Sequence, residues 1–206
     1  KPSLAKPKMK QGIPLKKLQI QTDLIFVRKD DLAAHNPKFG KDETLKKETY
    51  IITSVEAASG LVRLDYLTSK DQTNGALEKH IHWFAKKFGV KPSSLQVRSD
   101  KGSEYSMSRI KKLCPDYKFV QSATVCERKN RTVQSNFFRI LKNRQATSIV
   151  DALKKTESMC NDTVTKKHKR TPLEIVEDPE VSNKKIIEYS KEEKILGGDK
   201  CKVESC

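Results

Sequence analysis

The chain has 206 residues, enough for one well-buried domain with appendages or for two small domains. Lysine and arginine together number 42 against 26 acidic residues, which gives a formal net charge of +16. A charge of this size favours a polyanionic partner, nucleic acid above all; a basic surface that is merely solvated is the alternative. No apolar run approaches the roughly 18 residues of a membrane span and no signal peptide is visible, so we expect an intracellular protein without a membrane partner.

The cysteines exclude two further classes of protein. Five are present, at positions 114, 126, 160, 201 and 206, and no two of them form a CxxC pair. An odd number without such pairs argues against both a disulfide framework and a structural zinc site. We therefore expect reduced thiols.

The chain opens with a basic segment and then a strand. Residues 1–17 contain three prolines and show no periodicity, which is typical of an extended arm that follows a phosphate backbone, or of a plain linker. Residues 18–27 (LQIQTDLIFV) alternate between apolar and polar and predict a β-strand. Residues 28–48 are polar and are predicted to form a long exposed loop. Two β-rich runs, 49–57 and 61–67, are joined by a short turn and predict an antiparallel hairpin.

After the hairpin the apolar spacing changes from strand-like to helical. Apolar residues at helical spacing predict helices, and short β-rich runs between them predict strands. The predicted elements are a helix over 74–88, a strand over 95–98, a helix over 106–114, a strand over 118–121, and helices over 125–142 and 148–161. Antiparallel strands followed by alternating helices and strands indicate an α/β fold, with a mixed sheet flanked by helices on both faces.

Three acidic residues stand where such a sheet would bring them together. Asp23 lies inside the first strand, Asp100 ends the strand LQVRSD, and Glu127 opens a helix. A carboxylate within a central strand is costly to bury unless it is paired or holds a cation. Three converging carboxylates need a compensating positive charge, which a pair of Mg²⁺ or Mn²⁺ ions would supply for phosphodiester chemistry. Taken singly, an acidic residue at such a position is more often a cap or turn residue.

The surrounding motifs resemble a known family. LQIQTDLIF, VRSDKGSEY and VCERKNRTVQ are similar to the three acidic motifs of retroviral and retrotransposon integrase cores, with the closest likeness to integrases of Polinton/Maverick-type transposons. The resemblance runs in order from about residue 15 to residue 203. It implies an RNase H-like fold with a five-stranded mixed sheet, in which Asp23, Asp100 and Glu127 are catalytic and hold two Mg²⁺ or Mn²⁺ ions. It also implies a catalytic core over 18–177 and, over 178–206, a linker and the start of a small SH3-like segment.

Several polar residues are expected to contact nucleic acid. In the resembling family the helix that follows the glutamate faces DNA, and the lysines near the acidic residues are natural phosphate contacts or ordinary surface lysines. The basic run near position 168 would add affinity without sequence specificity, or act as a nuclear targeting patch. The candidates are Lys101, Lys129, Asn130, Arg131, Gln134, Lys166, Lys167, Lys169 and Arg170. His80 and His82 flank Ile81 on a helix, point to different sides and are expected at the surface.

Two functions from different classes follow from these observations. The first is an integrase-like enzyme that joins DNA 3′ ends to target DNA, works as a homo-oligomer and resides in the nucleus. The alternative is a domesticated, inactive integrase-like domain that binds RNA as a structural subunit of an organellar or cytoplasmic nucleoprotein particle. The interval from Asp100 to Glu127 is shorter than the family usually has, which favours the alternative, whereas the presence of all three acidic residues favours the enzyme. A third option, a nuclease or resolvase of the same fold, lacks the likeness around Glu127.

Overall fold

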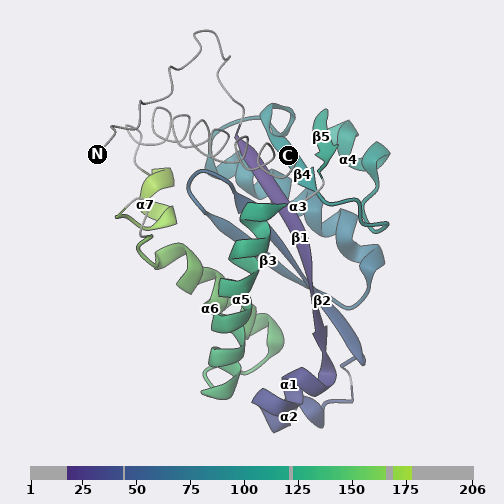
Figure 1. The fold of residues 1–206 in the computed structure, drawn as a ribbon, viewed down its shortest axis with the longest axis vertical. Helices are drawn as coiled ribbons and strands as arrows, with labels where there is room; N and C mark the ends of the chain where they lie inside the picture. Colours follow the sequence, from purple (N-terminus) through teal and green to yellow (C-terminus); the bar gives the residue numbers. More distant parts are fainter. Residues whose placement is uncertain (1–17, 44, 121–122, 166–168, 178–206) are drawn as a thin grey trace, which may run out of the picture.

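A mixed five-stranded sheet forms the centre of the molecule (Figure 1). The structure is a computed structural model, and it describes residues 18–43, 45–120, 123–165 and 169–177. The strands are β1 (Gln19–Arg28), β2 (Glu48–Glu56), β3 (Val62–Leu67), β4 (Gln96–Ser99) and β5 (Asp116–Phe119). Their order is β3-β2-β1-β4-β5; β1, β2 and β3 pair antiparallel, whereas β4 pairs parallel with both β1 and β5. This is the five-stranded mixed sheet that the resemblance to integrase cores implied.

Helices cover both faces of this sheet. The α-helices are α1 (Lys29–His35), α2 (Pro37–Gly40), α3 (Thr73–Lys87), α4 (Met107–Leu113), α5 (Thr124–Lys142), α6 (Ile149–Asp162) and α7 (Pro172–Glu177), and two short 3-10 turns lie at Lys70–Gln72 and Pro92–Ser94. One face packs against α3 and α4, and the other packs against α5 and α6 (Figure 1). None of the helices in these described ranges is long and apolar enough to cross a membrane.

The alternation of side chains along β1 explains why there are two apolar layers. Successive residues of a strand point to opposite faces of the sheet. Ile20 therefore packs in the layer under α3, whereas Ile25 and Val27 pack in the layer under α5 and α6. By the same alternation Asp23 lies on the face that α5 covers.

The segment between β1 and β2, predicted to be a long exposed loop, instead forms α1 and α2. Asn36 joins the two helices: its side chain accepts a hydrogen bond from the Lys38 N–H, and its Nδ2 donates to the Leu141 carbonyl at the end of α5. Leu32 and Phe39 are buried against α5. Two apolar residues seven positions apart are too few to show helical periodicity, which is why the prediction was wrong here.

Most other predicted elements are confirmed, with two differences. Strand β5 lies two residues earlier than predicted, and α7 was not predicted. At α6 the Ser148 Oγ accepts from the Asp151 N–H at 3.1 Å, which confirms the predicted N-cap. The proposed arm over 1–17, the segment 178–206, and Cys201 and Cys206 lie outside the described residues. The cysteines at 114, 126 and 160 are buried, and none of them forms a disulfide within the described ranges.

His80 was expected at the surface, but it is fully buried on the sheet-facing side of α3, whereas His82 is exposed. The Nδ1 atom of His80 lies 2.8 Å from the Ser54 Oγ, and the Ser54 hydroxyl in turn donates to the Thr22 Oγ1 at 3.1 Å. The Nε2 atom lies 3.3 Å from the Asp65 carboxylate, without hydrogen-bond alignment. The histidine is buried because this polar row satisfies part of its hydrogen-bonding capacity.

Candidate functional site

The parallel pairing of β1 with β4 places two of the predicted acidic residues side by side. Thr22 pairs with Ser99, the last residue of β4, so the next residues along the two strands are Asp23 and Asp100. Neighbouring strands lie about 4.8 Å apart, and these two residues point to the same face of the sheet. That face is the one covered by α5, whose first turn carries Glu127.

The start of α5 is held to the sheet by Gln21, a residue that the sequence did not single out. The Gln21 Oε1 accepts from the Val125 N–H at 3.1 Å and from the Cys126 N–H at 3.4 Å. These are two of the four N–H groups that the first turn of a helix leaves without a partner inside the helix. Gln21 lies two residues before Asp23 on the same strand face, so one strand fixes both the central aspartate and the helix that carries Glu127.

Asp23 accepts two hydrogen bonds, one at each carboxylate oxygen. The Leu24 N–H donates to its Oδ1 at 2.8 Å, and the Asn130 Nδ2 donates to its Oδ2 at 2.8 Å. Asn130 is 8% exposed, and its Oδ1 has no hydrogen-bond partner among the described residues. Asn130 was expected on a DNA-facing side of the helix, but it points to the sheet and orients the carboxylate of Asp23.

The electrostatic environment of Asp23 indicates that the other acidic residues are close to it. Burial raises the pKa of the Asp23 carboxyl above its ordinary value, and although the hydrogen bond from Leu24 opposes this, the negative charges of Asp100, Glu127 and Glu104 raise it further. Like charges around a half-buried carboxylate disfavour its ionised form. Within the described ranges, however, no three His, Cys, Asp or Glu side chains are gathered closely enough to hold a metal ion.

Glu104 is an acidic neighbour that the sequence reading missed. Its side chain folds back over Gly102: a methyl group at Gly102 would lie 2.4–2.6 Å from the three carboxyl atoms of Glu104. The Gly102 N–H donates to the Asp100 Oδ1 at 3.3 Å, which ties the same turn to Asp100. In the sequence, Glu104 is marked only by its position four residues after Asp100. That spacing does not indicate that the two side chains are close unless the turn between them is known.

The predicted nucleic-acid contacts are spread over several environments. Lys101 follows Asp100 directly and Arg131 lies four residues after Glu127; both are exposed. Gln134 is half-buried about one turn further along α5. Lys129 packs near Cys160 of α6, and burial there lowers the pKa of its ammonium group. The remaining candidates lie in the basic run: Lys169 and Arg170 are exposed, and Lys166 and Lys167 lie outside the described residues.

Known proteins resemble this chain in fold. No protein-family model and no curated protein matches the sequence. Among solved structures, the HTLV-2 integrase catalytic core domain in complex with magnesium, in its trimeric form, superposes with a TM-score of 0.58 at 16% identity, covering 79% of this chain and 97% of that one. Its dimeric form gives the same TM-score and identity, with 81% and 99% covered. The simian T-cell lymphotropic virus intasome in complex with PP2A regulatory subunit B56 gamma gives 0.60 at 14% identity, covering 84% of this chain and 58% of that one. The chain therefore has the fold of retroviral integrase catalytic cores.

Proposed function

We propose that the chain is an integrase-type DNA strand transferase in which Asp23, Asp100 and Glu127 are the catalytic residues. The observation that carries this proposal is the strand register: Asp23 and Asp100 are neighbours on the face of the sheet where α5 brings in Glu127. The raised pKa of Asp23, to which the charges of Asp100 and Glu127 contribute, supports the same grouping. The integrase-core fold adds support from the architecture.

The donor chemistry of this site fits Mg²⁺ or Mn²⁺, because carboxylate oxygens are the ligands that such hard cations prefer. Burial, and after it the neighbouring negative charges, raise the pKa of Asp23, and a divalent cation would offset both effects. We assign one ion to Asp23 and Asp100, and a second ion to Asp23 and Glu127. Ions held by these residues would supply activation of the attacking hydroxyl and stabilisation of the leaving oxygen of the phosphodiester.

Other residues of the chain would position this machinery. Asn130 and the Leu24 N–H hold both oxygens of Asp23, which limits rotation of the carboxylate. Gln21 fixes the first turn of α5 and, with it, the backbone of Glu127. Lys101 and Arg131 are exposed, and we expect them to contact DNA phosphates.

The partners proposed for this chain are DNA and further copies of the chain. Two DNA ends have to be held together for joining, and the HTLV-2 cores occur in dimeric and trimeric forms. The likeness of the motifs to Polinton/Maverick-type integrases favours a transposon origin and action in the nucleus. The basic residues around Arg170 would then add affinity for the DNA backbone.

The test is a strand-transfer assay with short duplex ends and either Mg²⁺ or Mn²⁺, comparing the wild type with Glu127→Gln. This substitution keeps the shape of the side chain and removes its charge. The control is Glu48→Gln, which changes an exposed glutamate at the far end of the β1–β2 pair. We expect Glu127→Gln to lower the yield of joined products more than roughly 100-fold. Replacing a residue that only orients a metal ligand typically lowers activity by about 10–100-fold. The Glu48→Gln control should retain them.

If folded wild-type protein formed no joined product with either Mg²⁺ or Mn²⁺, the proposed strand-transferase function would be contradicted. It would leave the alternative, in which the domain binds nucleic acid as a structural subunit.

A further inference from the structure

The loop that carries Asp100 is held only weakly by its own hydrogen bonds. It spans residues 100–106, between β4 and α4, and contains no helix or strand. Inside it, the Gly102 N–H donates to the Asp100 Oδ1 at 3.3 Å, and the Tyr105 N–H donates to the Gly102 carbonyl at 3.2 Å. Both distances lie at or beyond the long end of the normal range, so a firm position for Asp100 needs a contact from another element.

Asn74 supplies such a contact from α3. Its Nδ2 donates to the Glu104 carbonyl at 2.9 Å, and its Oδ1 accepts from the Ser106 N–H at 2.7 Å. One side-chain amide therefore binds the backbone on both sides of Tyr105, with shorter bonds than those inside the loop. Asn74 is the second residue of α3, and the apolar face of this helix is buried against the sheet, so the support is rigid.

Tyr105, the residue between these two bonds, joins the loop to β1. It is 5% exposed and packs in the apolar layer under α3. Its hydroxyl is buried beside Thr22, without an aligned hydrogen bond to any described residue. Burial raises the pKa of this hydroxyl, and the negative charges of Asp23 and Asp100 raise it further, which indicates that the end of the ring lies near both carboxylates. A shift of Tyr105 would therefore disturb the surroundings of both aspartates.

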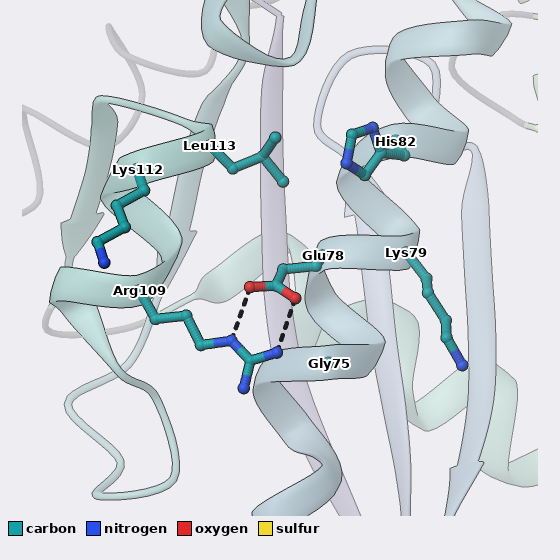
Figure 2. A pocket seen from close by; sticks show the side chains of 7 residues that line it. All are labelled: Gly75, Glu78, Lys79, His82, Arg109, Lys112 and Leu113. Carbon is teal, nitrogen blue, oxygen red and sulfur yellow. Dashed lines mark hydrogen bonds and ion pairs between the residues drawn. The ribbon is translucent and has the colours of Figure 1, made fainter.

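The helix that follows the loop is tied to α3 by a separate contact. Arg109 of α4 reaches across to Glu78 of α3, with its Nε 2.7 Å from Oε1 and its Nη2 2.8 Å from Oε2 (Figure 2). Both side chains are partly exposed, and an exposed ion pair contributes little to stability. The pair lies one turn along α3 from Asn74 and bonds to α4, not to the loop, so it provides a control for the contact between the two helices alone.

We propose that Asn74 is a positioning residue of the acidic site: by binding the backbone on both sides of Tyr105, it fixes the loop and, through the loop, the carboxylate of Asp100. The proposal rests on the proposed function, in which Asp100 is a ligand of a divalent cation. In this role Asn74 touches neither the cation nor DNA and acts through the backbone of Glu104 and Ser106. Loss of a residue that orients a metal ligand typically weakens metal binding by about 10–100-fold.

Hydrogen–deuterium exchange with mass spectrometry, in EDTA and without DNA, tests whether Asn74 fixes the loop. In Asn74→Ala we expect the amides of residues 100–106 to exchange about tenfold faster than in the wild type, because two hydrogen bonds are lost. Asn74→Asp retains an acceptor for the Ser106 N–H, so the acceleration should be smaller in this second variant. Exchange in α5 and α6 should stay as slow as in the wild type in both, which excludes misfolding as the cause.

The matched control is Asn161→Ala. Asn161 also binds one backbone segment twice, since its Oδ1 accepts from the Val62 N–H at 2.8 Å and its Nδ2 donates to the Val62 carbonyl at 2.9 Å. It is 4% exposed and lies on α6, so its loss should cost at least as much stability but leave the exchange of residues 100–106 unchanged. Glu78→Gln, which breaks the ion pair with Arg109, should also leave the loop unchanged.

Titration calorimetry with Mn²⁺ on the same full-length variants tests whether the position of the loop matters to the acidic site. We expect Asn74→Ala to bind Mn²⁺ about tenfold more weakly than the wild type. Asn161→Ala and Glu78→Gln should bind it as the wild type does. A role of Asn74 in stability alone would not produce this difference, because Asn161→Ala loses the same pair of hydrogen bonds.

Unchanged exchange of the loop in Asn74→Ala would overturn the proposal. Faster exchange with unchanged Mn²⁺ affinity would overturn it too, because Asn74 would then support the fold only. Equal acceleration in Asn74→Ala and Asn74→Asp would exclude the hydrogen bond from Ser106 as the cause. If the wild type bound no Mn²⁺, the proposed function would be contradicted, and the exchange measurement alone would then decide whether Asn74 fixes the loop.

Discussion

Replacing Gln21 with leucine should loosen the start of α5, because Gln21 is the acceptor for two N–H groups of its first turn. The bond from Val125 at 3.1 Å is of normal length, whereas the one from Cys126 at 3.4 Å is long and weaker. A hydrogen bond of this kind contributes about 1 kcal/mol, and loss of a helix cap typically costs about the same. We therefore expect the free energy of unfolding to fall by about 1–2 kcal/mol.

Urea denaturation followed by circular dichroism measures this change, which for a domain of this size corresponds to a fall in Tm of roughly 2–8 °C. The matched control is Gln145→Leu, which changes an exposed glutamine beyond the end of α5 and should leave stability within about 0.5 kcal/mol. If Gln21→Leu were as stable as Gln145→Leu, the proposed role of Gln21 in fixing α5 would be refuted.

Two further predictions concern the buried histidine and the turn after Asp100. Burial lowers the pKa of His80 below its ordinary value of 6.5, although Asp65 opposes this, so the unfolded chain takes up the proton first. The free energy of unfolding should therefore fall as the pH drops below about 6.5. Urea denaturation at a series of pH values should show this fall in the wild type and a smaller fall in His80→Gln. Equal pH dependence in the two proteins would exclude His80 as the cause. Gly102→Ala should cost less than about 1 kcal/mol in the same melts, since only the flexible end of Glu104 has to move away from the new methyl group. A larger loss would mean that the turn itself cannot accept a side chain.

The sequence predicted those parts of the fold that rest on local patterns. Alternation along residues 18–27 marked the central strand, and the order of strands and helices marked the mixed sheet. Asp100 directly follows a predicted strand, so it was expected at the carboxyl end of that strand. The parallel register of β4 with β1 then brings it beside Asp23. Strands and helices of this kind depend mainly on residues that are close in sequence, which is why their order could be predicted from a single sequence.

The contacts that shape the site were not predictable in this way, because they join distant positions. Asn130 and Asp23 are 107 residues apart, and helical spacing alone does not say which side of α5 faces the sheet. Lys129 illustrates the same limit: its partial burial follows from the placement of α6, near Cys160. His80 is buried because Ser54 and Asp65 lie opposite it on the sheet. Tertiary packing, not local pattern, decides each of these environments.

The placement of Asp23 beside Asp100 follows from the backbone hydrogen bonds between β1 and β4, which end at the Thr22–Ser99 pair, and β4 is only four residues long. Shifting one strand by a single residue would turn one aspartate to the opposite face of the sheet. Replacements on the covering helices change what surrounds the two carboxylates, whereas a one-residue deletion in either strand would separate them. Tyr117 on β5, whose hydroxyl lies 2.7 Å from the Ser99 Oγ, holds the short strand in place from its other side. Insertions and deletions in this protein should therefore be tolerated in its connecting loops long before they are tolerated in β1 or β4.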